Sequence, residues 1–248
     1  HITHRCHQRQ FLLKFSKDKK RWIYWLFRAR RNYGTTILNY TVTSNHIHLL
    51  VRDDKDRMTI PKTIQLAAGR CAQEYNARKN RKGAFWEDRY HATAIGPGNH
   101  LIRCMVYIDF NMVRAGVVDH PKDWGFGGFN EVMLPKRKCR IISHDILLKL
   151  YSCNSHELFA EQYGSVLADA LKNSENRKKK RGSQSIAVGD KTFVKDIKSQ
   201  LKARAVGRRV QKLDHEFALQ EEQRDYQTHF DTENFDIGEE NLYPWQFN

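Results

Sequence analysis

The sequence lacks several features that would place it in common protein classes. It has five cysteines, and no two of them form a Cys-x-x-Cys pair. This odd, scattered set argues against a disulfide framework or a structural zinc knuckle and favours a reducing cytosol. No apolar run approaches the ~18–20 residues that a membrane-spanning helix needs, and no secretory signal is visible. We therefore expect no membrane partner.

Acidic residues are scarce in most of the chain. The 248 residues include 43 Lys and Arg but 28 Asp and Glu, for a net charge of +15. From residue 211 to 248 there are ten acidic and two basic residues, a net of −8, so the first 210 residues carry +23. Such a basic body favours a polyanionic partner, and nucleic acid is the usual one.

The apolar run His46-Ile47-His48-Leu49-Leu50-Val51 predicts a buried strand, since it is rich in aliphatic and β-branched residues. Side chains alternate faces along a strand, so the two histidines share one face. Two neighbouring imidazoles on a strand are either half of a metal site or a pair of structural histidines. The pair alone does not decide between these interpretations.

Hydrophobic periodicity predicts the order strand, helix, strand, strand, helix, strand, helix. The expected strands are 2–15, 35–43, 46–51 and 89–95, and the expected helices are 17–33, one that opens at Pro61, and 100–115. This order fits an α+β fold, a ferredoxin-like antiparallel sheet backed by helices. We expect a compact domain over residues 1–130, a basic helical extension over 131–210 that assists DNA binding, and an acidic, flexible tail over 211–248.

The last of these helices has two distinct faces. An apolar face should pack on the sheet, whereas the second carries a phenol, a carboxamide and two guanidinium groups at spacings of four, four and three. The residues of this second face are Arg103, Tyr107, Asn111 and Arg114. Most faces of this kind are simply solvated. The functional interpretation is a phosphate site, in which the arginines bind phosphate oxygens and the tyrosine is a nucleophile.

The histidine pair and this helix combine chemically. Two His nitrogens and the amide oxygen of Asn111 form an open set of three ligands that suits Mg²⁺ or Mn²⁺. A cation there would polarise a phosphate as a Lewis acid, and a nearby phenol could attack phosphorus.

These residues resemble the HUH single-tyrosine transposases of bacterial insertion sequences, and most closely the REP-associated tyrosine transposases. The supporting segments are Trp-Glu-Asp-Arg-Tyr-His at 86–91, Tyr-Ile-Asp-Phe-Asn-Met-Val-Arg-Ala-Gly at 107–116 and Asp-Trp-Gly-Phe at 123–126. The resemblance covers roughly residues 1–130. Two positions depart from the family pattern: Met112 and Gly125 stand where the family usually has proline.

The resemblance implies a role for each matching residue. His46, His48 and Asn111 would bind Mg²⁺ or Mn²⁺, and Tyr107 would be the nucleophile. The family cleaves single-stranded DNA beside an imperfect hairpin and leaves a 5′-phosphotyrosine and a free 3′-hydroxyl that can rejoin strands. No nucleotide cofactor is implied. We expect a monomer or homodimer in the bacterial cytoplasm, associated with the nucleoid.

Three further residues are candidate DNA contacts. Trp86 could stack on an unpaired base or close the core, Arg89 could bind phosphate, and His91 could contact DNA or have a structural role. Two other functions stay open. One is a catalytically silent hairpin-binding protein; the other is an HUH replication initiator or relaxase, although these often carry a second tyrosine where this chain has Asn111 or Arg103.

Overall fold

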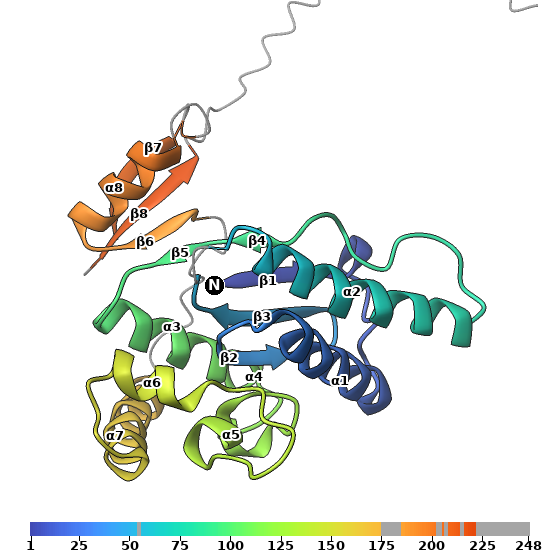
Figure 1. Cartoon of the computed structure of the whole chain (residues 1–248), viewed down its shortest axis with the longest axis horizontal. Helices are drawn as coiled ribbons and strands as arrows, with labels where there is room; N and C mark the ends of the chain where they lie inside the picture. Colours follow the sequence, from blue (N-terminus) through green and yellow to red (C-terminus); the bar gives the residue numbers. More distant parts are fainter. Residues whose placement is uncertain (54–55, 175–184, 202–204, 206–207, 214–215, 222–248) are drawn as a thin grey trace, which may run out of the picture.

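The centre of the molecule is a four-stranded antiparallel sheet in the order β2-β3-β1-β4. The computed structural model describes residues 1–53, 56–174, 185–201, 205, 208–213 and 216–221. The strands are β1 (Ile2–Arg5), β2 (Ile37–Val42), β3 (His46–Val51) and β4 (His91–Ala92). With α1 (Ser16–Tyr33) and α2 (Thr59–Arg78) they follow the order βαββαβ (Figure 1). The predicted ferredoxin-like α+β fold is confirmed.

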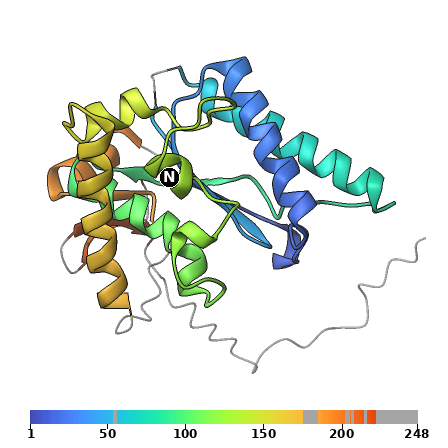
Figure 2. The same cartoon turned by 90° about the horizontal axis from the view of Figure 1, so that it is seen from below.

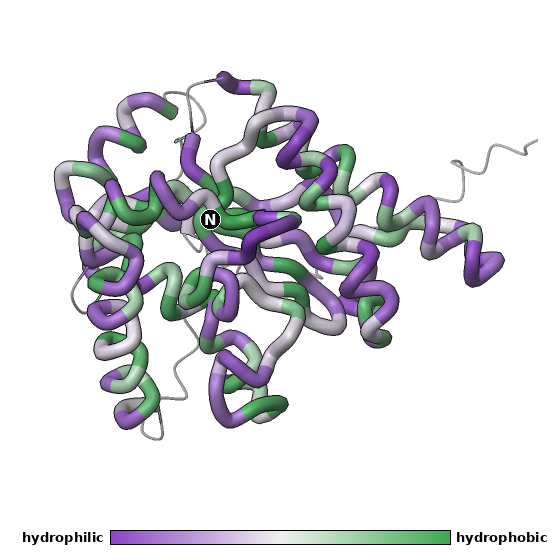
Figure 3. The backbone as a smooth tube through the Cα atoms, turned by 60° about the horizontal axis from the view of Figure 1, so that its bottom comes forward, coloured by the Kyte–Doolittle hydropathy of each residue, from purple (hydrophilic) through white to green (hydrophobic). Residues whose placement is uncertain are grey.

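Helices cover both faces of this sheet. The helices α1 and α2 pack against each other on one side, whereas α3 (Asn99–Asp109) contacts β2 and β3 from the other (Figure 2). Hydrophilic and hydrophobic segments alternate along the helices, as expected when each helix buries one side (Figure 3). On α1 the buried positions include Trp22, Leu26 and Ala29, and the helix ends at Gly34, whose φ of 69° and N–H bond to the Arg30 carbonyl form a left-handed cap.

Three of the predicted elements differ from the structure. The first strand ends at Arg5, because Gln8 and Arg9 have positive φ angles of 50° and 56° and the chain turns there. The predicted strand 89–95 is split into β4 and β5 (Ala94–Ile95), and these belong to different sheets. The helix predicted over 100–115 is also interrupted: α3 ends at Asp109, and α4 (Asn111–Arg114) begins after Phe110.

The segment after residue 130 belongs partly to the same core. The helix α5 (Phe129–Met133) crosses the predicted boundary, and α6 (His144–Leu150) and α7 (His156–Ser174) follow it. Buried side chains of this segment lie in one hydrophobic cluster with the central sheet; they include Ile141, Ile142, Leu147, Phe159, Tyr163 and Leu167. Among the described residues, none of the helices has the length and apolar content that crossing a membrane requires.

A second sheet has the order β5-β6-β8-β7. Its other strands are β6 (Ala187–Gly189), β7 (Arg208–Leu213) and β8 (Glu216–Glu221), and the helix α8 (Lys191–Leu201) packs on them. These four elements lie together in Figure 1. The prediction of a purely helical extension was therefore wrong. The predicted flexible tail is also contradicted for 211–213 and 216–221, because alternate apolar residues such as Phe217 and Leu219 pack against α8. The basic run at 176–181 and residues 222–248 lie outside the described residues.

Candidate active site

The two predicted metal-binding histidines lie side by side on β3. The ring centroids of His46 and His48 are 4.8 Å apart, and the rings are perpendicular. His48 is 2% exposed. Its strand is central in the sheet, between β2 and β1, so its position is fixed by hydrogen bonds on both sides. The predicted strand and the shared face of the two histidines are confirmed.

Neighbouring polar groups fix the orientation of the His46 ring. Its Nδ1 lies 2.7 Å from Asn45 Oδ1 and 2.9 Å from Thr43 Oγ1. When Nδ1–H donates to these oxygens, the lone pair is on Nε2, which is then available to a cation. Burial, and secondarily the charge of Arg5, lowers the pKa of His46 to about 4. The neutral imidazole, which is the form that binds metal, is therefore favoured.

Both nitrogens of His48 have neighbours. Nε2 lies 2.9 Å from Asn111 Nδ2, and Nδ1 lies 3.0 Å from His1 Nε2 and 3.3 Å from Thr3 Oγ1. Burial, followed by the charges of His46 and Arg114, holds the pKa of His48 well below its usual value. Nε2 of His48 therefore faces Asn111. The opposite side of the ring is held by Thr3 of β1 and by His1, which directly precedes that strand.

Tyr107 lies next to the histidines in the same chain. Its ring centroid is 5.6 Å from that of His48 and 5.9 Å from that of His1. The Arg114 guanidinium carbon lies 4.2 Å from the Tyr107 ring centroid, and Arg114 Nη2 donates to the Tyr107 carbonyl at 2.7 Å. The Arg114 guanidinium over the ring and its hydrogen bond to the Tyr107 carbonyl together restrict the movement of this tyrosine.

The helix breaks at Phe110, between Tyr107 and Asn111, and both of these residues lie beside His48. Phe110 has φ −78° and ψ 0°, outside ordinary helix geometry, and its side chain is buried. The apolar face predicted for this helix is confirmed, because Leu101, Met105, Ile108 and Met112 are all buried.

The residues near the histidine pair could hold a divalent cation. Two imidazole nitrogens and one amide form a mixed N/O set, and a half-turn of the Asn111 amide would exchange Nδ2 for Oδ1 beside His48. Within the described part of the chain, no cluster of three or more His, Cys, Asp or Glu side chains is arranged to hold a metal. The fit therefore depends on the amide of Asn111.

Two of the other predicted DNA contacts, Arg103 and Trp86, have partners outside this cluster. Arg103 forms an ion pair with Glu216 of β8, with 3.5 Å between Nη1 and Oε2. Trp86 is anchored in the fold, because Nε1 donates to the Ala68 carbonyl at 3.0 Å and its ring stacks on His4 at 4.2 Å. Arg89 is exposed.

His91 is half-buried on β4 opposite Thr3, and burial is the main cause that lowers its pKa. Its part in DNA binding, like that of Arg89, Trp86 and Arg103, stays a prediction.

Sequence reasoning missed the groups that orient the two histidines. Asn45 directly precedes His46, so a polar neighbour at the turn was a signal that could have been used. His1 and Thr3 reach His48 only through the pairing of β1 with β3, in which Thr3 lies opposite His48. That pairing joins residues far apart in the chain, and no local pattern reveals it.

Part of the chain is similar to known proteins. Residues 1–111 match the family described as IS200-like transposases. A solved structure of a REP-associated tyrosine transposase bound to a REP hairpin aligns with 19% identity and a TM-score of 0.42, over 54% of this chain and 78% of that chain. No curated protein matches the sequence significantly. The segment that matches this family includes His46, His48, Tyr107 and Asn111.

Proposed function

We propose that this protein is a metal-dependent transposase or single-strand endonuclease that cleaves and rejoins single-stranded DNA beside an imperfect hairpin. The observation that supports the proposal best is the position of Tyr107 beside His48, whose Nε2 faces the Asn111 amide. A phenol next to a set of three metal-binding side chains is what attack on a phosphodiester requires.

The proposed reaction uses Tyr107 as the nucleophile. Its Oη forms a bond to phosphorus, the bond between phosphorus and the 3′-oxygen breaks, and the phenol proton is balanced by the proton that the 3′-hydroxyl gains. The product is a 5′-phosphotyrosine, which keeps the energy of the phosphodiester, so no nucleotide cofactor is needed. Attack by a 3′-hydroxyl on this linkage rejoins a strand and releases the tyrosine.

Each neighbouring side chain has a proposed part in this step. His46, His48 and Asn111 would hold Mg²⁺ or Mn²⁺, which supplies Lewis acidity to the scissile phosphate. Arg114 holds the Tyr107 ring from one face and can bind a phosphate oxygen with its guanidinium. Asn45 and Thr43 contact His46 Nδ1 and would leave Nε2 available to the cation.

The test is covalent capture of DNA. Wild type, Tyr107→Phe and Tyr33→Phe are incubated with labelled single-stranded hairpin DNA and Mn²⁺, and the adduct is counted on a denaturing gel. We expect an adduct from wild type and from Tyr33→Phe, whose tyrosine is at the exposed end of α1. Equal adduct from Tyr107→Phe would show that the nucleophile is another group. Wild type that binds the hairpin without forming any adduct would favour the silent binding protein.

A further inference from the structure

A polar cavity lies at the end of α1, away from the candidate active site. Its volume is about 410 Å³, and its lining includes Arg30, Thr36, Arg140, Ser143 and His144. The Ser143 N–H donates to the carbonyl of Ile37, where β2 begins. His48, in contrast, pairs with Thr41, toward the other end of β2. The cavity is therefore a separate site from the cluster around Tyr107.

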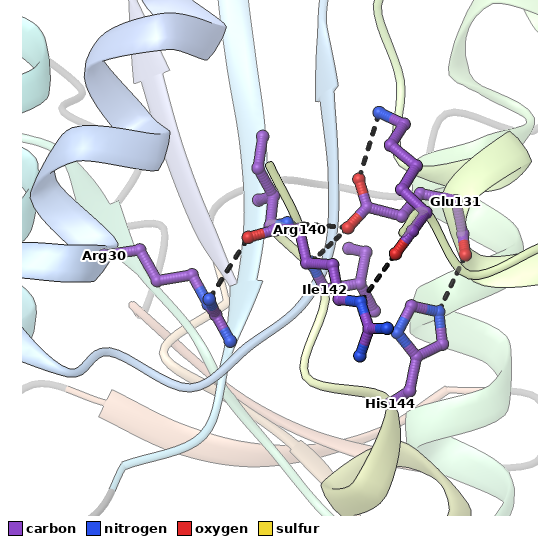
Figure 4. A network of polar contacts seen from close by, with 7 residues as sticks. Arg30, Glu131, Arg140, Ile142 and His144 are labelled. Carbon is purple, nitrogen blue, oxygen red and sulfur yellow. Dashed lines mark hydrogen bonds and ion pairs between the residues drawn. The ribbon is translucent and has the colours of Figure 1, made fainter. Parts of the chain in front are cut away.

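The wall of this cavity is held firmly by buried polar contacts. Glu131, 1% exposed, accepts the backbone N–H groups of Ile141 and Ile142 at 2.6 and 2.8 Å, and its own carbonyl lies 2.7 Å from His144 Nε2. Figure 4 shows these contacts on one side of the loop and Arg30 reaching the Arg140 carbonyl from α1 on the other. The cavity is thus preformed.

Arg30 has a donor that is not used within the protein. Its Nη1 donates to the Arg140 carbonyl at 3.1 Å and its Nη2 to Ser143 Oγ at 3.4 Å, whereas Nε is buried and has no hydrogen-bond partner among the described residues. A buried guanidinium N–H without an acceptor is costly, so an acceptor from outside the chain is expected. Within the described part of the chain, neither Arg30 nor Arg140 forms an ion pair with a carboxylate; Asp145 is exposed at the rim.

The surface around the cavity is basic. Exposed cations follow the lining residues along the chain or precede them; they are Arg31 on α1 and Arg137 and Lys138 on the loop before Arg140. One small phosphate compound could bind inside the cavity, but it would not contact these outer cations. A nucleic-acid backbone presents many phosphates and can contact the cavity and its rim together.

We propose that this cavity binds a backbone phosphate of the DNA substrate at a second site, outside the catalytic one. Arg30 and Arg140 contact the phosphate oxygens, with Ser143 beside them, and the outer cations bind neighbouring phosphates. This inference rests on the proposed function, because it takes the DNA of that reaction as the ligand. It gives α1 and the loop 134–143 a role in holding the substrate.

The test measures DNA binding without cleavage. Every variant also carries Tyr107→Phe, and binding to a single-stranded hairpin DNA is followed by fluorescence anisotropy at several salt concentrations. Arg30→Gln and Arg140→Gln should each weaken binding about tenfold. Each should also reduce the slope of log affinity against log salt by about 1. The matched control is Lys79→Gln, which removes the same charge at the far end of α2, and it should weaken binding by less than about threefold.

Lys79 is a suitable control because of its distance from the cavity. Thr63 of α2 contacts Thr35, which lines the cavity, and Lys79 follows 16 residues later, about 24 Å along a helix. Arg140 is exposed, so its replacement should keep the fold even if Arg30→Gln does not, and thermal melting checks this. A folded Arg140→Gln that binds DNA as well as the control overturns the proposal.

Two further outcomes distinguish a DNA site from a site for free phosphate, and this proposal from the proposed function. Inorganic phosphate is titrated into wild type and Arg30→Gln and followed by thermal shift. If phosphate stabilises only wild type while DNA affinity is the same in all variants, the ligand is a free phosphate and the DNA assignment is wrong. If wild type forms no covalent adduct but Arg30→Gln and Arg140→Gln still weaken hairpin binding, the proposed function fails and the second site stands.

Discussion

Replacement of Tyr163 by phenylalanine should destabilise the protein far more than the same change at Tyr151. Tyr163 is fully buried on α7, and its hydroxyl donates to Asp109 Oδ2 at 2.5 Å. Asp109 ends α3 and is 6% exposed, and its Oδ1 accepts from Asn39 Nδ2 of β2 at 2.8 Å. Burial raises the pKa of Asp109 to about 7, and the bonds from Tyr163 and Asn39 oppose that rise.

The size of the effect follows from these contacts. At pH 8.5 most of Asp109 is ionised, so Tyr163→Phe removes one of two donors to a buried carboxylate. Loss of a hydrogen bond to a charged group should cost about 1.5–3 kcal/mol of unfolding free energy. Among the described residues, the Tyr151 hydroxyl donates only to the Met105 thioether, at 3.3 Å. Sulfur is a weak acceptor, so Tyr151→Phe should cost about 0.5 kcal/mol or less.

Urea unfolding at pH 8.5, followed by far-UV circular dichroism, measures both variants against wild type. The slopes of the unfolding curves should be the same, so that the shift in midpoint reports stability. Equal losses of unfolding free energy in Tyr163→Phe and Tyr151→Phe would refute the reasoning, because the hydrogen bond to Asp109 would then add nothing to stability.

Three more predictions follow from single contacts. Asn45→Ala removes the nearer of the two acceptors that orient His46 and should weaken Mn²⁺ binding about tenfold, as measured by calorimetry; unchanged affinity would contradict the role of Asn45. Gly128→Ala would place a Cβ 2.5 Å from a side-chain oxygen of β2 and should cost about 1–3 kcal/mol in urea unfolding, whereas Gly164→Ala, within α7, should gain about 1 kcal/mol. Burial lowers the pKa of His144, so its contribution to stability is present above pH 6.5 and lost as the pH falls through its lowered pKa; urea midpoints at pH 7.5 and 5 should differ less in His144→Gln than in wild type.

The elements predicted best from the sequence were those with a strong local pattern. The strand His46–Val51 is apolar along its length, and α1 repeats its large apolar residues with helical period, so both were predicted nearly at their observed bounds. The hairpin of β7 and β8 was missed because its sequence is mostly charged or polar, with few apolar residues such as Val210. It is a strand pair because α8 packs on one face and β6 pairs with β8, which a local pattern does not reveal.

Local sequence patterns also predicted part of the candidate site. Helical period placed Tyr107 and Asn111 on one face, and the structure brings both to His48. Period also placed Arg103 on that face, but its partner is Glu216, 113 residues further along the chain. Where a side chain finds a distant partner, spacing within one helix gives the wrong neighbour.

The helix that carries Tyr107 depends on residues beyond the family match. Near its start Arg103 and His100 both contact Glu216 of β8, and at its end Asp109 needs the Tyr163 hydroxyl of α7. Removal of everything after residue 130 would leave the buried Asp109 with one donor and would expose the part of the hydrophobic core that α6 and α7 cover. A buried carboxylate with only one hydrogen-bond donor and a hydrophobic core exposed to water both lower the free energy of unfolding. Residues 1–130 should therefore not form a stable domain alone. The expected boundary at residue 130 therefore divides one cooperative structure, and the position of Tyr107 is set partly by the segments that follow it.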